Sequence, residues 1–571
     1  MVVARQRHVR GKCWPGVVPI TLVVGVMWLT GICHATDVQI IALGDSLTQG
    51  TMDASDNVEN TLNAYLQQTV NSLSTVLSVK FSQPLCDFYG HRLLPFQIPT
   101  NLGVDGADIF SIEGYEYYKR VGATASYLTD AYRCNSDWPF QFQDNYDRVL
   151  YPINVVAGQS VTQLDAALTL LKRQEAAQDG SIAVIFLWIG NNDSSLATLG
   201  TGGSNPFYIP LPLDAVSSKI SPVLNLFLQA ARSKGLVSFD PYTSQAIQRN
   251  MTDVSDFTTQ LNHILERLHQ ENPLGDNRTQ IFLMTLPYYS AVGYLFDSDD
   301  LEFYLQQVNP KYQVPGAFQR VAQPGAAITD PFKGDRVSLL TFACMYALLQ
   351  NGASIDDVNA VLENNGVQQD GMVLSESEQQ YVMSRIDSFN AAIKAAAGSY
   401  RNVAVLDIGA YIDNVLSGAT PVTVGGKTLS RKWSRGSTFS LDGVHPGYTG
   451  QALIANYLIE KLNAAYQLNA PSIDLKTVMA QDPYVDRDGD GWVSTPSYPP
   501  GAGLTQLMFM FTDPNDADAS VRPVPPSDFW QKVSTILLKK ISGQSAALQQ
   551  MADSVSLQRY SSAADHAQAS R

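Results

Sequence analysis

The stretch that most constrains this chain is an apolar, β-branched run that ends abruptly in Gly44-Asp45-Ser46. Residues 38–43 have the pattern of a buried parallel strand, and Gly44 supplies the tight turn after it. The strand therefore delivers Ser46 at its carboxyl end, which is the edge where open α/β sheets bind ligands. The alternative interpretation is a Gly-Asp-Ser turn that merely caps a helix.

Segments of strand and helix character alternate along most of the chain. Apolar runs typical of strands are followed by amphipathic or capped runs typical of helices. The later strands are predicted at residues 153–158, 181–189, 280–286 and 403–408, and the helices at 61–77, 164–171, 216–234, 253–270, 376–398 and from 446 onward. This alternation predicts an α/β protein with three layers (α/β/α), in which a central parallel sheet lies between two layers of helices.

Two loop-rich insertions interrupt the alternation, at about residues 79–151 and 288–334. The first is rich in aromatic residues, and we expect it either to wall a substrate pocket or to form a self-packed loop layer. The composition changes near residue 470, which predicts one domain over 36–470 and a C-terminal extension over 471–571. The extension is rich in Pro, Gly and Asp at first, and its Ser/Ala/Gln-rich end is expected to be mobile.

The charge balance bears on the partners of the protein. The chain has 53 acidic and 38 basic side chains and a net charge of −15. Because phosphate backbones would be repelled, we expect no binding of nucleic acid. Peripheral contact with an anionic lipid surface would need a local basic patch or a bridging cation.

The first 35 residues have the pattern of a signal peptide. Four basic residues lie between positions 5 and 12, an apolar run covers 17–32, and Cys33-His34-Ala35 resembles a cleavage site. This pattern predicts a secreted or periplasmic protein. The alternative is an uncleaved segment that anchors the protein in a membrane, because the apolar run is nearly long enough to span one.

Three cysteines follow that segment, Cys86, Cys134 and Cys344. An oxidising compartment would permit a disulfide between Cys86 and Cys134 within the first insertion. Ordinary buried thiols are the alternative for this pair. Cys344 lies in an apolar, helix-like run and is expected to be free.

A serine nucleophile needs a base, and histidine is scarce here. Beyond the first 35 residues the histidines are His91, His263, His269, His445 and His566. Only His445 has an aspartate three residues before it, with a glycine between them. That spacing lets one loop fold the carboxylate of Asp442 onto Nδ1 of His445 and direct Nε2 toward Ser46. The serine lacks the G-x-S-x-G elbow of the α/β-hydrolases, so we do not expect that fold.

The oxyanion of the reaction needs hydrogen-bond donors. The predicted strand 181–189 ends in Gly190-Asn191-Asn192-Asp193. An amide at the carboxyl end of a strand can donate to a developing oxyanion, a role that we assign to Asn192. The backbone N–H groups of Ser46 and of a glycine would supply the other donors, and Asp193 is expected to order the loop.

These residues resemble the sequence blocks of the SGNH hydrolases, the superfamily of GDSL-type lipases and esterases. The matching blocks are Gly44-Asp45-Ser46-Leu47, Gly190-Asn191-Asn192-Asp193 and Asp442-Gly443-Val444-His445, in the order of the family. In that family the serine attacks, a glycine and the asparagine complete the oxyanion hole, and the histidine is the base. The resemblance covers about residues 38–465, is closest to bacterial members, and implies a flavodoxin-like fold with no cofactor for catalysis.

Two segments compete for the glycine of the remaining block. The sequence of residues 101–106 is more similar to the motif of this block in the family, and it would supply Gly106. Residues 154–158 would supply Gly158. We favour Gly158 because a predicted strand precedes it and one helix separates it from the strand that leads to Asn192.

A separate acidic segment resembles a calcium loop. Asp486, Asp488 and Asp490 stand at positions one, three and five, a glycine stands at six, and the carbonyl of Trp492 stands at seven. Position twelve is Ser497 and not the glutamate of an EF-hand. The segment is interpreted either as a structural Ca²⁺ site or as an acidic solvated turn.

The sequence as a whole predicts an exported serine hydrolase that cleaves carboxylic esters through an acyl-Ser46 intermediate. The aromatic insertions favour lipid-like acyl esters, as in lipases and lysophospholipases. A carbohydrate acetylesterase or a thioesterase would use the same groups. A calcium-dependent surface-binding module without catalysis is the alternative from another class, but it would not need Ser46, Asn192, Asp442 and His445 together. The oligomeric state has no signal in the sequence.

Overall fold

A computed structural model describes residues 37–542, apart from 125–126, 129, 139–141, 143, 203–205, 323–331 and 500–504. The predicted signal peptide and the predicted mobile end of the chain lie outside the described residues. All the described residues belong to one compact unit.

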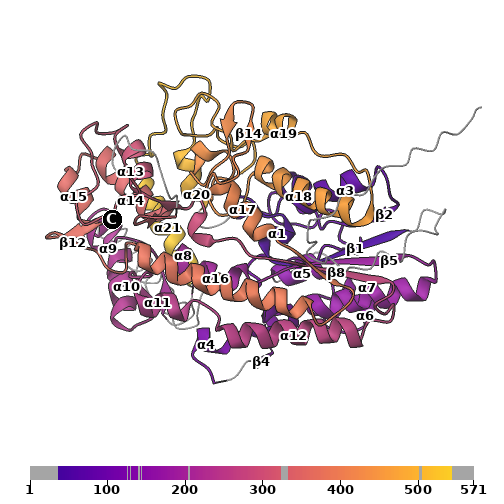
Figure 1. Ribbon diagram of the computed structural model, residues 1–571. Helices are drawn as coiled ribbons and strands as arrows, with labels where there is room; N and C mark the ends of the chain where they lie inside the picture. The colour runs from indigo at the N-terminus through magenta and orange to yellow at the C-terminus, as the bar shows by residue number, and fades with distance from the viewer. Residues whose placement is uncertain are drawn as a thin grey trace, which may run out of the picture. The chain divides into compact units, whose positions relative to one another are not determined.

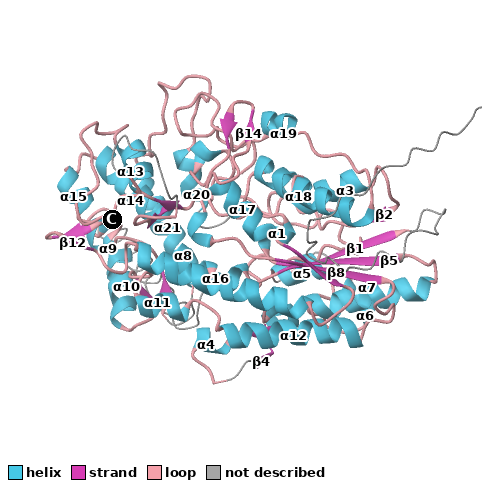
Figure 2. Cartoon of the chain, in the orientation of Figure 1, coloured by secondary structure: helices cyan, strands magenta, loops and turns pink. Residues whose placement is uncertain are grey.

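A five-stranded parallel sheet forms the centre of this unit (Figures 1 and 2). In the order of the sheet its strands are β13 (Val403–Leu406), β8 (Thr279–Met284), β5 (Ile182–Trp188), β1 (Val38–Gly44) and β2 (Val79–Lys80). β1 and β5 are apolar and almost continuously buried, as expected for strands covered on both faces.

Helices cover both faces of the sheet. In Figure 1, α3 (Tyr65–Leu73) and α18 (Tyr448–Tyr466) lie together on one side, and the other side carries α7 (Gln163–Ala177), α12 (Val254–Gln270) and α16 (Glu376–Ala397). The predicted α/β fold with a central parallel sheet between helices is therefore confirmed.

The strand order locates the edge where a site is expected. Numbered along the chain, the five strands lie in the order 2-1-3-4-5. The connection that follows β1 therefore crosses one face of the sheet, and the connection that follows β5 crosses the opposite face. Open α/β sheets bind ligands at such a switch point, outside the carboxyl ends of the strands. The register pairs Gly44 at the end of β1 with Trp188 at the end of β5. The residues after these two strands therefore share one edge.

The edge beside β1 is built from two separate pieces of chain. β2 pairs only with the first two residues of β1. Further along, the N–H of Ala42 donates to the carbonyl of Thr100 at 2.9 Å, and the N–H of Leu102 donates to the carbonyl of Ala42 at 2.8 Å. The N–H of Val104 reaches the carbonyl of Gly44 at 3.1 Å. Residues 81–99 are thus an excursion within one edge strand.

The predicted strand at residues 153–158 is wrong. These residues form a short helix, α6 (Ile153–Ala157), and Gly158 ends it with a φ of +69°. The β-branched residues gave a strand pattern, but the place beside β1 is already filled by residues 100–104. Tertiary pairing therefore overrides the local preference.

Most of the predicted helices are confirmed, namely α7, α12, α16, α18 and also α10 (Pro222–Ser233). The predicted helix at 61–77 is divided, because α2 (Val58–Leu62) ends before α3 begins. The other helices of four or more residues are α1 (Ser46–Gln49), α4 (Tyr118–Val121), α5 (Asn145–Leu150), α8 (Ser195–Leu199), α9 (Leu213–Val216), α11 (Ser244–Arg249), α13 (Ser298–Leu305), α14 (Leu339–Gln350), α15 (Ile355–Asn359), α17 (Ile408–Leu416), α19 (Leu475–Gln481), α20 (Thr505–Met508) and α21 (Phe529–Ser542).

Small two-stranded sheets decorate the unit outside the central sheet. They pair β3 (Tyr115–Glu116) with β4 (Tyr127–Leu128), β6 (Phe207–Tyr208) with β7 (Val237–Ser238), β9 (Leu295–Phe296) with β10 (Val337–Ser338), β11 (Glu363–Asn364) with β12 (Val367–Gln368), and β14 (Thr423–Val424) with β15 (Lys427–Thr428). The pair β3/β4 lies within the first predicted insertion and the pair β9/β10 within or beside the second, and both insertions are loop-rich as expected.

The three cysteines are free and buried. The disulfide between Cys86 and Cys134 is not formed, and the alternative of buried thiols holds. Cys86 pairs through its backbone with Asn57 and Arg92, whereas Cys134 pairs with Val161. The two residues are therefore held in different parts of the insertion.

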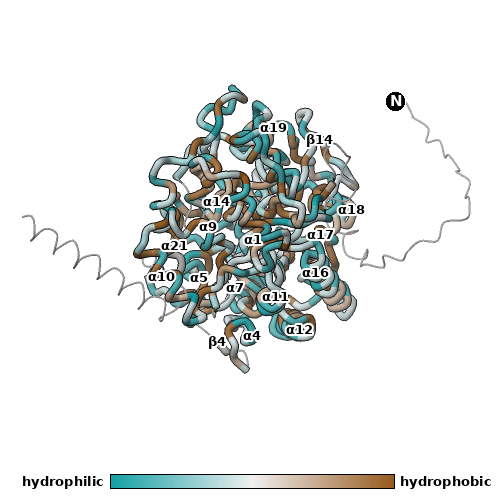
Figure 3. Tube along the Cα trace, turned by 90° about the vertical axis from the view of Figure 1, so that its left-hand side faces the viewer, coloured by the Kyte–Doolittle hydropathy of each residue, from teal (hydrophilic) through white to brown (hydrophobic). Residues whose placement is uncertain are grey.

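Hydropathy follows the layers of the fold. Figure 3 shows hydrophilic segments on the outside, among them α11 and α16, and more hydrophobic stretches of the chain inside. Within the described part of the chain, no helix combines the length and the apolar composition that crossing a membrane requires.

Candidate active site

Ser46 begins α1 directly after the end of β1. A Cβ on Gly44 would lie 2.4 Å from Oγ1 of Thr48 and 2.5 Å from the carbonyl of Trp188, so only glycine fits there. Gln163 of α7 holds the turn, because its amide accepts from the N–H of Gly44 and donates to its carbonyl, each at 3.1 Å. The strand-to-serine turn predicted from the sequence is confirmed.

Asp45 fixes the first turn of α1. One carboxylate oxygen accepts from the N–H of Leu47 at 3.0 Å, and the other accepts from Nδ2 of Asn191 at 2.8 Å. Asn191 follows β5, so this bond ties the turns after β1 and β5 together. Burial raises the pKa of Asp45 to about 7, against the effect of these two donors.

His445 connects Ser46 with Asp442, as the spacing predicted. Nε2 of His445 lies 2.8 Å from Oγ of Ser46, and Nδ1 lies 2.7 Å from Oδ2 of Asp442. The serine and the histidine are 399 positions apart in the chain. All three side chains are largely buried, so water screens the contacts between them only weakly.

The loop that carries His445 is closed on itself. The N–H of Ser440 donates to the carbonyl of His445 at 2.8 Å, and the N–H of Gly443 donates to the carbonyl of Ser440 at 2.9 Å. Gly443 has a φ of +68°, and a Cβ there would lie 2.6 Å from the backbone nitrogen of Tyr294. Glycine is therefore required between the aspartate and the histidine.

Asp442 is held by several donors. Oδ1 accepts from the N–H of Val444 at 2.8 Å and from the N–H of His445 at 2.9 Å. It also accepts from Oγ of Ser440 at 3.0 Å, and Oδ2 accepts from the N–H of Ala54 at 3.0 Å. Burial would raise the pKa of Asp442, but the charge of His445 and these hydrogen bonds lower it to about 2. The carboxylate is therefore ionised at neutral pH.

The charge of His445 responds to three carboxylates. Burial acts to lower the pKa of His445, but the charge and hydrogen bond of Asp442, together with the charges of Asp105 and Asp45, raise it to about 9. Protonated imidazole is therefore favoured at neutral pH in the free site. A base must be neutral, so the site as it stands favours alkaline conditions for proton abstraction.

Asp53 supports the His445 loop and was not predicted from the sequence. It is buried with a φ of +54°, which is unusual for a residue with a side chain. Its carboxylate accepts from the N–H of Leu441 at 2.7 Å and from the hydroxyl of Tyr498 at 2.8 Å, and its N–H donates to Oγ of Ser440 at 3.1 Å. Burial, with the nearby charge of Asp442, raises its pKa to about 7. No local pattern of the sequence marks this residue.

Asn192 lies at the same edge, just after β5. Its Nδ2 donates to the carbonyl of Ala107 at 2.9 Å, and its Oδ1 accepts from Oγ of Ser195 at 3.1 Å. These bonds hold the amide beside Ala107. The second hydrogen of Nδ2 takes no part in either bond, so it can be donated to another acceptor. Asp193 orders the loop as expected, because it accepts from the N–H of Ile109 at 2.9 Å and from Oγ1 of Thr252 at 2.6 Å.

The choice of Gly158 for the oxyanion hole is wrong. Its N–H closes the end of α6 by bonding to the carbonyls of Asn154 and Val155, so it is not available to a substrate. Residues 100–104 instead run along β1, and Ala107, which directly follows Gly106, contacts Asn192. The structure therefore favours Gly106. Its sequence motif at residues 101–106 was recognised, but the excursion at 81–99 separates residues 100–104 from β2 and obscures the strand that leads to this glycine.

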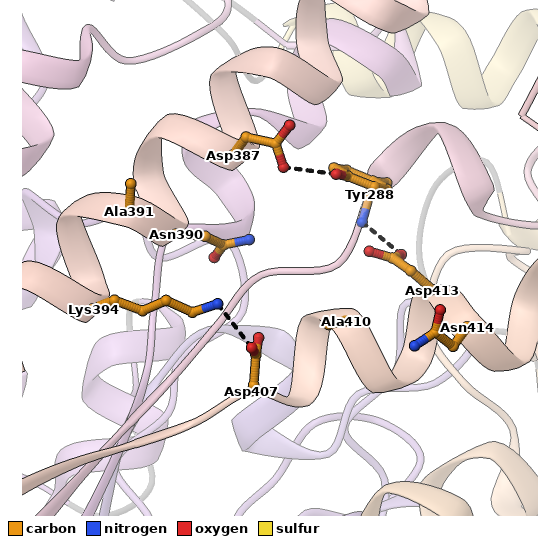
Figure 4. A pocket seen from close by; sticks show the side chains of 9 residues that line it. All are labelled: Tyr288, Asp387, Asn390, Ala391, Lys394, Asp407, Ala410, Asp413 and Asn414. Atoms are coloured by element: carbon orange, nitrogen blue, oxygen red, sulfur yellow. Dashed lines mark hydrogen bonds and ion pairs between the residues drawn. The ribbon is translucent and has the colours of Figure 1, made fainter. Parts of the chain in front are cut away.

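A cavity of about 400 Å³ lies at another part of the same sheet edge, between α16 and α17 (Figure 4). Tyr288 donates its hydroxyl to Asp387 at 2.6 Å and its N–H to Asp413 at 2.9 Å, and Lys394 pairs with Asp407 at 2.7 Å. None of the residues that line this cavity belongs to the group of Ser46, His445 and Asp442.

The three aspartates predicted as one calcium loop are divided between two groups of carboxylates. Carboxylate oxygens of Asp488 and Asp490 gather with one of Asp513, and those of Asp486 and Asp488 gather with one of Asp516. Both later aspartates come from a segment that the sequence pattern did not include. The side chain of Trp492 is fully buried in the core.

A scan against protein-family models finds no match, and a search of curated proteins finds none either. The resemblance to the SGNH hydrolases therefore rests on the three sequence blocks.

Proposed function

We propose that this protein is a serine hydrolase of the SGNH type that cleaves carboxylic esters. The observation that carries the proposal is the pair of contacts at His445, 2.8 Å to Oγ of Ser46 and 2.7 Å to Asp442. A hydroxyl, an imidazole and a carboxylate in this order form the proton path of serine hydrolases. The 2-1-3-4-5 strand order and the place of Ser46 at the switch point support the same class.

The reaction would proceed in two halves. His445 takes the proton of Ser46 as Oγ attacks the carbonyl carbon of the ester, and it then gives this proton to the departing alcohol. Asp442 holds the imidazole in the required tautomer throughout. His445 next takes a proton from the water that attacks the acyl-Ser46 carbonyl, and it returns this proton to Oγ of Ser46 as the acyl–oxygen bond breaks and the acid is released. No cofactor is needed for either half.

The oxyanion of each tetrahedral intermediate needs donors at the same edge. We assign the backbone N–H groups of Ser46 and Gly106 and the Nδ2 group of Asn192 to this role. The bond from Asn192 to the carbonyl of Ala107 supports the assignment, because it brings the amide next to Gly106. One such donor is typically worth about 10²–10³ in rate.

Exposed apolar side chains support lipid-like acyl esters as substrates. In the excursion at 81–99, Tyr89 is 81% exposed, Phe96 is 68% exposed and Leu94 is 51% exposed. The excursion begins where Cys86 pairs with Asn57, close to Ala54, which donates to Asp442. Exposed apolar groups gathered on one segment are typical of contact with an apolar partner. Carbohydrate acetyl esters and thioesters are alternatives that the same triad would serve.

We also propose that the protein is exported from the cell that makes it. The basic and then apolar pattern of residues 1–35 supports secretion into an extracellular or periplasmic space. Mass spectrometry of the N-terminus of the protein recovered from its producing cells tests this part. A mature chain that starts near residue 36 is expected, and an intact first segment would favour the anchored alternative.

Hydrolysis of p-nitrophenyl esters of graded acyl length tests the activity. We expect turnover that falls to background in Ser46→Ala, with an optimum at medium or long acyl chains. An optimum at acetate would favour the acetylesterase instead. Turnover that survives Ser46→Ala, or its absence from the wild-type protein with every ester, would refute the proposal and favour a binding module.

A further inference from the structure

The acidic loop before Trp492 has a backbone that only glycine permits. Gly489 and Gly491 adopt φ values of +89° and +94°. A Cβ on Gly491 would lie 2.4 Å from the ring of Phe303. Asp486 closes the turn, because its carboxylate accepts from the N–H of Gly489 at 2.7 Å and from that of Gly491 at 3.0 Å.

A second segment completes the cluster. The N–H of Asp513 donates to the carbonyl of Val493 at 2.7 Å, and Asp513 pairs with Ser494 as in a parallel sheet. Asp516 anchors the segment further, because it accepts from the N–H of Arg487 at 2.9 Å and from Oγ of Ser494 at 2.7 Å. The side chain of Asp513 is thereby directed to the loop of Asp488 and Asp490.

Three carboxylates of this cluster each use one oxygen and leave the other without a partner. Oδ1 of Asp488 accepts from the N–H of Asp490 at 3.1 Å, Oδ1 of Asp490 accepts from that of Trp492 at 2.8 Å, and Oδ1 of Asp513 accepts from that of Asn515 at 2.9 Å. Oδ2 of each is buried and has no hydrogen-bond partner within the described residues. Asp490 is only 6% exposed and Asp513 only 2%.

These three charges are not neutralised by basic side chains among the described residues. Another group of three aspartates shows the contrast, because Asp297 and Asp300 contact Arg431 and Lys432 at 2.9–3.3 Å. A buried carboxylate oxygen that has neither a hydrogen-bond donor nor a counter-ion is unfavourable. A bound cation would satisfy all three at once.

We propose that Asp488, Asp490 and Asp513 bind one Ca²⁺ ion. Carboxylate oxygens of the three residues lie within 4.8 Å of one another. Two oxygens on one Ca²⁺ are separated by at most about 5 Å, twice the usual metal–oxygen distance, and Ca²⁺ prefers carboxylate ligands. The neighbouring carbonyls and water would complete the coordination.

The site has a structural consequence near the active site. Trp492 follows Asp490 and packs edge-on against Trp433 at 5.9 Å, and Nε1 of Trp433 donates to the carbonyl of Leu441 at 2.9 Å. Leu441 directly precedes Asp442. The bound ion therefore fixes a segment whose core residues support the loop of the catalytic aspartate.

Terbium luminescence tests the site without using the esterase activity. Tb³⁺ occupies Ca²⁺ sites, and Trp492 lies close enough to sensitise its emission. With the full chain excited at 280 nm, we expect saturable Tb³⁺ emission that Ca²⁺ displaces. Asp513→Asn should weaken Tb³⁺ binding at least tenfold, whereas Asp299→Asn in the neutralised cluster should leave it unchanged. The absence of saturable emission, displacement by Mg²⁺ but not by Ca²⁺, or equal binding by both variants would overturn the proposal.

Thermal unfolding supplies a second signature. In millimolar Ca²⁺ the wild-type Tm should exceed its value in EGTA by several degrees, because a ligand that binds only the folded state stabilises it. In EGTA, Asp513→Asn should have the higher Tm, because it removes one of three repelling charges. The wild-type protein should therefore have the higher Tm in Ca²⁺, and Asp513→Asn should have the higher Tm in EGTA. The same order in both buffers would show that the cluster binds no calcium.

Discussion

Two polar sites lie along the same carboxyl edge of the sheet, and they differ in what their groups can do together. At the ends of β1 and β5, Ser46 and His445 meet. At the ends of β8 and β13, the cavity of Figure 4 gathers Asp413 with other polar groups. Burial raises the pKa of Asp413 to about 7, as it does for Asp45 near the serine. A raised carboxyl pKa is therefore common to both sites and does not distinguish them.

The difference lies in the connection between the polar groups. In the cavity, Lys394 pairs with Asp407 and Tyr288 donates to Asp387, so each of these contacts joins a donor directly to a carboxylate. At the serine, a hydroxyl, an imidazole and a carboxylate form one continuous path for a proton. A large cavity thus does not by itself locate the chemistry. The following variants test whether the serine site alone is catalytic.

The largest effect is expected for Ser46→Ala. Removing Oγ removes the proposed nucleophile, so kcat for a p-nitrophenyl ester should fall by roughly 10⁶-fold, as it does when the nucleophile of a serine protease is removed. Circular dichroism and Tm should remain near those of the wild type, because the hydroxyl is a small group. A decrease in kcat of less than tenfold would show that Ser46, at the end of β1, is not the nucleophile.

Asp442→Asn should have the next largest effect. The amide keeps the shape of the side chain but cannot hold His445 in the tautomer that accepts the serine proton, so kcat should fall by about 10⁴-fold. Asp407→Asn in the cavity is the matched control and should leave kcat within about twofold. Equal losses in the two variants would show that the two sites do not differ in function.

Asn192→Ala tests the oxyanion assignment. Loss of one donor should lower kcat by about 10²–10³-fold with little change in KM, because the oxyanion exists only after attack. Gly158→Ala is the control: a Cβ there meets open space, and its φ of +69° should lower Tm somewhat but leave kcat within about twofold. A loss of kcat in Asn192→Ala no larger than in Gly158→Ala would contradict the assignment of Asn192.

The pH profile gives a smaller and sharper test. Because the pKa of His445 is raised to about 9, the neutral base becomes more abundant as pH increases, and kcat/KM should rise through the alkaline range. Asp105→Asn removes one of the negative charges that raise this pKa. The rising limb should therefore move to lower pH, and kcat/KM at pH 7 should increase by roughly two- to fourfold. A limb that stays in place would mean that Asp105 does not influence His445.

The smallest effect is expected for Asp413→Asn. The amide can still accept from the N–H of Tyr288, and burial of a neutral group is less unfavourable than burial of a charged one. Activity should stay within about twofold and Tm should be unchanged or slightly higher. A selective loss of activity toward one acyl length would instead connect the cavity with substrate binding.

The sequence predicted what depends on local patterns. The apolar run before Gly44 predicted the first strand and the serine turn, and the spacing of Asp442 and His445 predicted the contact between this carboxylate and this imidazole. These signals are short, and the geometry that they require is largely set by the segment itself. The structure brings the two segments together as expected.

What the sequence did not reveal depends on contacts between distant segments. The strand beside β1 is made of residues 79–80 and 100–104, and the excursion between them breaks its alternation. Gly106 was therefore passed over for Gly158. Asp53 and Asp513 were missed for the same reason, because their partners lie far away in the chain. Local propensity cannot report pairing of this kind.

Covalent labelling with a fluorophosphonate tests most directly whether His445 activates Ser46 as a nucleophile. The reagent reacts with a serine only where a base activates the hydroxyl and donors stabilise the oxyanion. Peptide mass spectrometry of the labelled protein should place the modification on Ser46, and His445→Ala should abolish it. A label on another residue, or a Ser46 that remains unmodified in folded wild-type protein, would contradict the account.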